Sequence, residues 1–150
     1  MEKGGWGQYT LRRNDLLYPE LSFRINGVLF EVYKQLGGGH NESFYQKAVA
    51  IGLKNAGIKF VGQQHVPLKF QDEKVGKYFL DFLVEDKIIL ELKRGHWLPI
   101  AVLNQVKGYL ESLNLDLAIV ACFANDGVII KRVINEKKVP KTLKPTRYTG

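Results

Sequence analysis

The stretch FLDFLVEDKIILELK, residues 79–93, decides the fold that this sequence predicts. It contains most of one run of strand-forming residues, 77–84, and all of a second, 88–93, and the polar triplet 85–87 separates the two. Two such runs with a short polar connection are typical of a β-hairpin. Because side chains alternate along a strand, the polar residues within these runs can be assigned to a face of the predicted sheet.

The predicted hairpin carries three polar side chains that can act together. Asp81 lies among apolar neighbours, and Glu91 and Lys93 share one face of the second strand. The short turn allows Asp81 and Glu91 to converge beside the ammonium group. Two carboxylates, waters and phosphate oxygens are typical ligands of Mg²⁺, and an ion held there favours phosphodiester hydrolysis. The alternative is a Glu–Lys pair on an exposed strand face, with Asp81 in a polar rim.

Hydrophobic periodicity extends this hairpin into an α/β domain. Apolar residues recur at helical spacing in some segments and follow a strand pattern in others. A helix connects the strands 88–93 and 117–123, so the sheet is expected to be mixed. We expect this mixed sheet to be flanked by helices, with the elements in the order helices 20–36 and 42–55, strands 58–70, 77–84 and 88–93, helix 100–113, and strands 117–123 and 128–134.

Local patterns predict further details of these elements. Asn41 is expected to cap the second helix with its side chain, and Gly57 is expected to end it. Residues 71–76 are expected to form a turn. One face of the second helix is expected to consist of Phe44, Ala48, Ile51 and Gly52.

The composition fits a single globular domain. The chain has 150 residues, of which 45% are hydrophobic and 25% charged, as in ordinary globular proteins. Its only cysteine, Cys122, cannot form an internal disulfide and lies in an apolar run. No apolar run reaches the length of a membrane span, and the N-terminus does not resemble a secretory signal. We therefore expect a cytoplasmic protein with no membrane partner.

Positive charge gathers at the C-terminal end of the chain. The formal net charge is +7, and residues 131–150 hold seven basic residues and one acidic residue, so that segment contributes +6 and residues 1–130 contribute +1. We divide the chain into an N-terminal extension (1–19), a domain (20–135) and a basic tail (136–150). Such a tail suits contact with nucleic acid, and the alternative is a solvated tail that aids solubility.

The heptad Gly39-x-x-Glu42-x-x-Tyr45 resembles the GxxExxY family of the PD-(D/E)xK nuclease superfamily, which has a restriction-endonuclease-like fold. The strand sequences around Asp81 and Glu91 follow in that family's order, and the resemblance covers roughly residues 20–135. It implies that Asp81, Glu91 and Lys93 form the nuclease core and that Glu42 brings a third carboxylate toward the metal. The sequence departs from the family in having Leu80 where a proline usually precedes the core aspartate.

A second element, Gln105-x-x-x-Tyr109, places an amide and a phenol on one helix face. Its spacing resembles the Gln-x-x-x-Tyr element of nuclease domains related to bacterial recombination helicase-nucleases and lambda exonuclease. That resemblance implies a helix lining the active-site cleft, where Gln105 orients a water or a phosphate and Tyr109 contacts nucleic acid. The alternative is an exposed glutamine and a tyrosine packed on the sheet.

Taken together, these residues indicate a Mg²⁺- or Mn²⁺-dependent nuclease acting on DNA. The candidate metal ligands are Asp81, Glu91 and Glu42, and the further candidates for nucleic-acid contact are Tyr45, Arg94, His96 and Trp97. The alternative function is a catalytically silent module that binds nucleic acid or a protein partner. Dimerisation lets a compact nuclease reach both strands, so a homo-oligomer is a further hypothesis.

Overall fold

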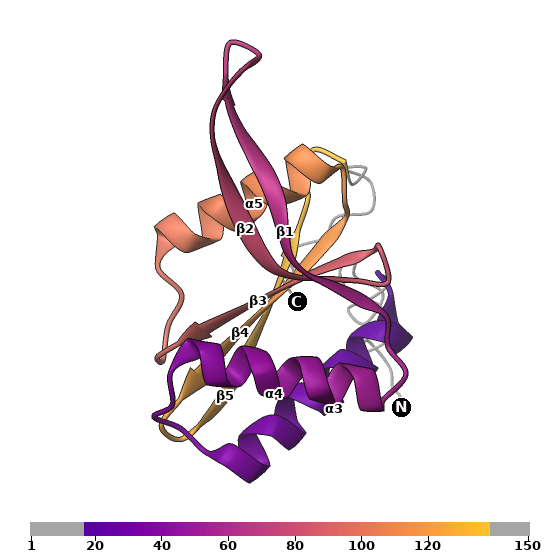
Figure 1. Ribbon diagram of the computed structural model, residues 1–150, viewed down its shortest axis with the longest axis vertical. Coiled ribbons are helices and arrows are strands. Elements are labelled where there is room, and N and C mark those ends of the chain that lie inside the picture. Colours follow the sequence, from indigo (N-terminus) through magenta and orange to yellow (C-terminus); the bar gives the residue numbers. More distant parts are fainter. Residues whose placement is uncertain (1–16, 139–150) are drawn as a thin grey trace, which may run out of the picture.

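The computed structural model describes residues 17–138 (Figure 1). Within that range the helices and strands follow one another in the predicted order. They are α3 (Pro19–Leu36), α4 (Glu42–Asn55), β1 (Phe60–Phe70), β2 (Glu73–Val84), β3 (Ile88–Arg94), α5 (Ile100–Leu113), β4 (Leu117–Ala124) and β5 (Gly127–Ile134).

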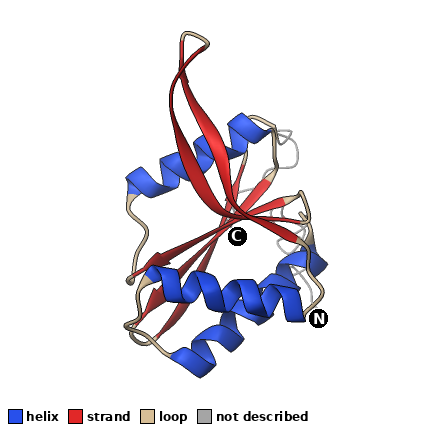
Figure 2. Cartoon of the chain, in the orientation of Figure 1, coloured by secondary structure: helices blue, strands red, loops and turns tan. Residues whose placement is uncertain are grey.

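The strands form one mixed sheet in the order β1-β2-β3-β4-β5. β3 and β4 are parallel and connected through α5, whereas the other neighbouring pairs are antiparallel. Helix α5 covers one face of the sheet, and α3 and α4 cover the other (Figure 2). The structure therefore confirms the predicted α/β fold with a mixed sheet between helices.

The centre of the sheet is buried on both faces because helices cover each side. On β3, Leu90 and Leu92 pack in the core beneath α3 and α4, while Ile89 packs in the core beneath α5. Every residue of β4 is buried. Burial on both faces explains why the sequence of β4 is a continuous apolar run rather than an alternating one.

The hairpin of β1 and β2 is longer than the sequence predicts. Only Gln71 and Asp72 form the turn, with φ angles of 49° and 67°, as in tight hairpin turns that match the strand twist. The prediction of a turn over residues 71–76 is therefore wrong, because Glu73 to Gly76 continue the strand pairing. As a result, this hairpin projects well beyond the rest of the domain (Figure 1).

Helix α4 has the predicted bounds but a different buried face. Tyr45, Val49 and Leu53 are its buried residues, whereas Phe44 and Ile51 are 50% and 61% exposed. The helix is oriented in this way because Tyr45 stacks on Phe123 of β4, with ring centroids 4.2 Å apart. The predicted face was therefore wrong at its two largest apolar residues.

The ends of α4 differ in how well they follow the prediction. At the N-terminus the backbone carbonyl of Asn41 accepts a hydrogen bond from the amide of Phe44, and the Asn41 side chain makes no capping bond, contrary to the prediction. At the C-terminus Gly57 has a φ of 72°, and the amide of Ile58 donates to the carbonyl of Leu53. This is a glycine-dependent helix end, as predicted.

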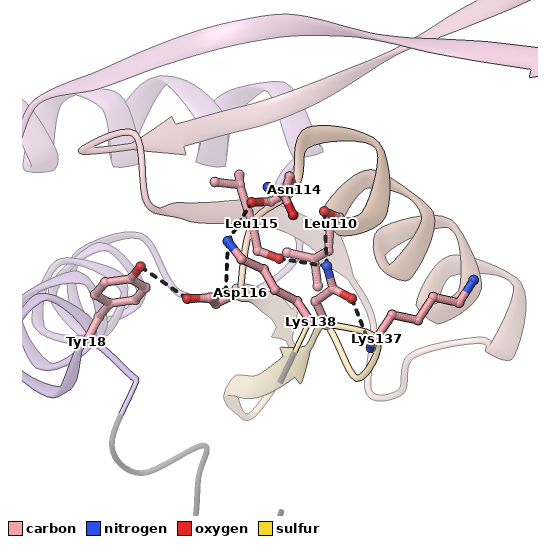
Figure 3. A network of polar contacts seen from close by, with 8 residues as sticks. Tyr18, Leu110, Asn114, Leu115, Asp116, Lys137 and Lys138 are labelled. Carbon is pink, nitrogen blue, oxygen red and sulfur yellow. Dashed lines mark hydrogen bonds and ion pairs between the residues drawn. The ribbon is translucent and has the colours of Figure 1, made fainter. Parts of the chain in front are cut away.

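Polar contacts tie the C-terminal end of the described chain to the domain (Figure 3). Lys138 forms an ion pair with Asp116 at 3.2 Å, and Asp116 also accepts a hydrogen bond from the hydroxyl of Tyr18. The Asn135 amide donates to the carbonyls of Leu110 and Leu115. These contacts link the start of α3, the end of α5 and the end of β5.

Parts of the predicted terminal segments lie outside the described residues. These are residues 1–16 of the N-terminal extension and residues 139–150 of the basic tail. Among residues 17–138, no helix combines the length and the apolar character that a membrane span requires.

The loop before α4 is held close to the end of β4. The Tyr45 hydroxyl donates to the carbonyl of Gly37 at 2.6 Å, which ties the loop to its own helix. A Cβ atom at Gly38 would lie 2.6 Å from the carbonyl oxygen of Ala124 and 2.7 Å from Cα of Asn125. These neighbours are backbone atoms, so a side chain at Gly38 would displace the start of α4.

We therefore predict that Gly38→Ala lowers the free energy of unfolding by about 1–3 kcal/mol, as overpacking does elsewhere. Gly27→Ala is the matched control because a Cβ atom at this helical position meets nothing within 4 Å. That control should raise stability by roughly 0.5–1 kcal/mol, since glycine inside a helix is unfavourable. Urea denaturation of both variants checks this, and equal stability of Gly38→Ala and the parent would contradict the described loop packing.

Candidate active site

The candidate site lies where β2 separates from β3. The two strands pair only at Phe82↔Leu90, Leu83↔Ile89 and Val84↔Ile88. On the N-terminal side of Phe82, β2 pairs with β1 alone and forms the projecting hairpin. On the C-terminal side of Leu90, β3 continues along β4 to Arg94. Asp81 and Glu91 are the next residues at this point of separation.

The two carboxylates each bond to the backbone of the opposite strand. The amide of Asp81 donates to Oε2 of Glu91 at 2.6 Å, and the amide of Leu92 donates to Oδ2 of Asp81 at 2.8 Å. The exposed fractions of Asp81 and Glu91 are only 9% and 3%. Side-chain oxygens thus satisfy buried amides that would otherwise lack partners where the ladder ends.

Burial and mutual repulsion make this pair of carboxyl groups costly to ionise. The pKa of Glu91 is raised to about 8, mainly by burial and next by the charge of the nearby Asp81. Burial also raises the pKa of Asp81. The positive charge of Lys93 opposes both shifts, and the negative charge of Glu42 adds to them. A cation between the carboxylates would offset the same repulsion.

Gln46 is a site residue that reasoning from the sequence missed. Its Nε2 donates to Oδ1 of Asp81 at 2.9 Å, so both oxygens of Asp81 are held by hydrogen bonds. Gln46 lies four residues after Glu42, on the same face of α4. The four-residue spacing from Glu42 was the signal in the sequence that could have identified Gln46, and it equals the spacing from Gln105 to Tyr109 on α5.

Glu42 lies at the start of α4 and is partly buried. It acts electrostatically on both Asp81 and Glu91. Within residues 17–138, no three His, Cys, Asp or Glu side chains gather in a way that could hold a metal ion. The structure therefore brings two of the three predicted ligands together, and a ligand role for Glu42 stays a prediction.

Gln105 and Tyr109, both on helix α5, differ in how deeply they are buried. Gln105 is half-buried and lines a groove of about 570 Å³ between α5 and the β1–β2 hairpin. Tyr109 is only 4% exposed, and burial, followed by the charge of Glu91, raises the pKa of its hydroxyl. Tyr109 also lines this groove, from beneath its surface, and its contact with nucleic acid stays a prediction.

The prediction that Tyr45 contacts nucleic acid is wrong, because this residue is fully buried. Its ring stacks on Phe123, and its hydroxyl bonds to Gly37, so no part of it remains for nucleic acid. The error has a physical reason. A phenol at helical spacing serves equally well as an apolar packing group with one buried hydrogen bond.

The residues that follow β3 remain accessible. Arg94 and His96 are exposed, and Trp97 is 76% exposed. Nδ1 of His96 lies 3.6 Å from Oδ1 of Asp126, in the turn between β4 and β5. The structure thus leaves these three predicted contact residues at the surface beyond Lys93.

Comparison with known proteins agrees with this geometry. The profile of the PD-(D/E)XK nuclease superfamily matches residues 19–134, and the chain belongs to that superfamily. No curated protein sequence matches the chain. Among solved structures it is similar to the crystal structure of SSO0001, with 14% sequence identity, a TM-score of 0.43 and coverage of 76% of each chain.

The raised pKa of Glu91 predicts a pH dependence of stability in the metal-free protein. Its ordinary value is 4.5 and its folded value about 8, so the fold favours the protonated form. The stability that this preference contributes is complete below about pH 4.5 and is lost as the pH rises through about 8. Glu91→Gln should therefore gain stability over the parent between about pH 5 and about pH 9.

Urea denaturation in EDTA at several pH values measures this difference. Glu73→Gln removes an exposed carboxylate at the start of β2 and is the matched control, and it should not reproduce the gain of Glu91→Gln. A Glu91→Gln curve parallel to the parent would show that Glu91 does not resist ionisation in the folded state.

Proposed function

We propose that this protein is a divalent-metal-dependent nuclease that hydrolyses phosphodiester bonds of DNA. The observation that carries the proposal is the meeting of Asp81 and Glu91 at the split between β2 and β3, with Lys93 close enough to lower the pKa of both. Membership in the PD-(D/E)XK nuclease superfamily supports this reaction class. We also propose that the protein acts in the cytoplasm and that it forms a homo-oligomer.

The donor set fits Mg²⁺ or Mn²⁺. Both ions prefer oxygen ligands, and Mg²⁺ is commonly held by one or two carboxylates with the rest of its shell filled by waters and substrate. Each carboxylate oxygen has two lone pairs, so the hydrogen bonds to Asp81 and Glu91 leave acceptor capacity for a cation. When bound, the cation would supply positive charge to stabilise the transition state at phosphorus. Glu42 is proposed as a third carboxylate that adds to the attraction for the ion.

The chain's own polar groups would orient the reaction. The ammonium group of Lys93 cannot ligate a cation, so we assign it to hydrogen bonds with the attacking water or a phosphate oxygen. Gln105, which lines the groove between α5 and the β1–β2 hairpin, is proposed to position the water or the substrate. Arg94, His96 and Trp97 would contact the nucleic acid beyond the site.

We further propose that the chain is a member of the GxxExxY family. Its heptad residues have distinct positions in the structure: Gly39 adopts a φ of 88° in the loop before α4, Glu42 starts the helix, and Tyr45 ties the helix to the loop. The heptad would thus serve to hold Glu42 and Gln46 beside the carboxylates.

A catalytically silent binding module is the second candidate. It is favoured by the finding that only two carboxylates, and no group of three metal-ligating side chains, come together in residues 17–138. Incubation of the protein with linear single-stranded, linear duplex and circular DNA, with and without Mg²⁺ or Mn²⁺, separates the two functions. Metal-dependent cleavage supports the nuclease, and binding without cleavage of any substrate supports the module.

We predict that Lys93→Ala reduces metal-dependent cleavage by about 100-fold or more, as the removal of a group that stabilises the transition state does elsewhere, and leaves Mn²⁺ binding intact. Asp81→Ala should lose both, because it removes a ligand. Calorimetric titration with Mn²⁺ and a cleavage assay measure the two properties.

The matched control is Lys93→Met, which keeps the aliphatic stem of the lysine without its charge and should be as inactive as Lys93→Ala. Loss of Mn²⁺ binding in Lys93→Ala, or cleavage at the parent rate, would show that the role of Lys93 is assigned wrongly.

A further inference from the structure

The projecting hairpin has two faces with different surroundings. Residues directly opposite each other on antiparallel strands place their side chains on the same face. Val66 and Tyr78 form one such pair, and both line the groove against α5 together with Leu68. This face of the hairpin is therefore turned toward the body of the domain.

The opposite face is basic. The pairs His65↔Phe79 and Pro67↔Lys77 alternate with the pairs that face α5, and the pair Lys69↔Lys74 follows after a register shift between Leu68 and Lys69. We call the side chains of this second face the basic face; they include three lysines, a histidine and an aromatic ring, namely His65, Lys69, Lys74, Lys77 and Phe79. Lys77 lies over the Phe79 ring at 5.7 Å, and the His65 ring meets Phe79 edge-on at 4.4 Å.

Two lysines of the basic face oppose each other directly. Like charges at opposite positions of a β-ladder destabilise the pair, yet Lys69 and Lys74 occupy such positions. Neither ammonium group has an ion-pair partner among residues 17–138. The nearest acidic residues do not share the face, because Asp72 lies in the turn and Glu73 pairs with Phe70 on the other side. The opposed lysines do not favour folding, and their charge is complementary to a polyanion.

The basic face leads directly to the candidate active site. Lys77, Phe79 and Asp81 alternate along β2 and so share one face. The hydrogen bond from Gln46 of α4 to Asp81 agrees with this placement, because α4 lies on the side of the sheet opposite α5. At about 3.3 Å per residue, Lys77 is roughly 13 Å and Lys74 up to roughly 23 Å along the strand from Asp81.

We infer that the basic face of the β1–β2 hairpin binds the phosphate backbone of the nucleic acid on which the site acts. Phosphates of one strand follow each other at about 3.4 Å along a duplex, so the lysines would reach phosphates up to about seven nucleotides from the bond at the site. This inference rests on the proposed nuclease function for the identity of the ligand. It adds a binding surface outside the catalytic residues.

The test is the salt dependence of binding to duplex DNA in EDTA, measured by fluorescence anisotropy with no turnover. Lys69→Gln/Lys74→Gln should bind more weakly, and the slope of log affinity against log salt should fall by about 0.9 for each phosphate that is no longer neutralised, or about 1.8 for two. The matched control is Lys34→Gln/Lys54→Gln, which removes two exposed lysines at the ends of α3 and α4 and should keep the parent slope.

A further readout separates the causes. Thermal denaturation should find Lys69→Gln/Lys74→Gln at least as stable as the parent, because a like-charge pair has been removed, so weaker binding would not reflect unfolding.

An unchanged slope for Lys69→Gln/Lys74→Gln, or an equal decrease in the control, would overturn the inference. Because binding is measured without cleavage, its result is distinct from that of the nuclease proposal. If DNA binding depends on Lys69 and Lys74 but the protein cuts no substrate, the inference about the basic face is upheld and the nuclease proposal is overturned. If the protein cuts DNA but its binding does not depend on these lysines, the nuclease proposal is upheld and the inference is overturned.

Discussion

The exchange of hydrogen bonds between two carboxylates and two backbone amides, at the point where β2 leaves β3, is the interaction on which the rest of the structure depends. Asp81 and Glu91 satisfy amides that the ending ladder leaves without strand partners. The strands can therefore diverge inside the protein without an unsatisfied backbone. That divergence frees the β1–β2 hairpin to project and at the same time holds two acidic groups together in a buried position, where the charged state is costly.

The surrounding elements help to stabilise the two buried carboxylates and hold them in position. The loop from Gly37 packs against the end of β4 and is tied by the hydroxyl of Tyr45, so the first turn of α4 is fixed beside the carboxylates. Gln46 holds one oxygen of Asp81 from that helix, and Lys93 brings positive charge from β3. A site assembled from β2, β3 and α4 in this way holds its carboxyl oxygens in position before a cation arrives. A cation bound there would take the place of the proton that burial favours on Glu91.

Much of the fold could be predicted because periodicity and short turns are local signals. The bounds of α4 and the mixed order of the sheet followed from them, and so did the meeting of Asp81 with Glu91. The residues that were misplaced depend on tertiary contacts. The buried face of α4, for example, is set by the stacking of Tyr45 on Phe123. Gln46 was missed because a glutamine on a helix carries no local sign of which side chain it will meet.

The central claim is that the split between β2 and β3 forms a cation site from Asp81 and Glu91. Anomalous diffraction at the manganese edge, from crystals grown with Mn²⁺, tests this most directly because it locates the ion without reference to activity. We predict one strong peak between the two carboxylates, with an oxygen of each as a ligand. Ordered Mn²⁺ found only at other sites, with Asp81 and Glu91 still bonded to the opposite amides and no ion between them, would contradict it.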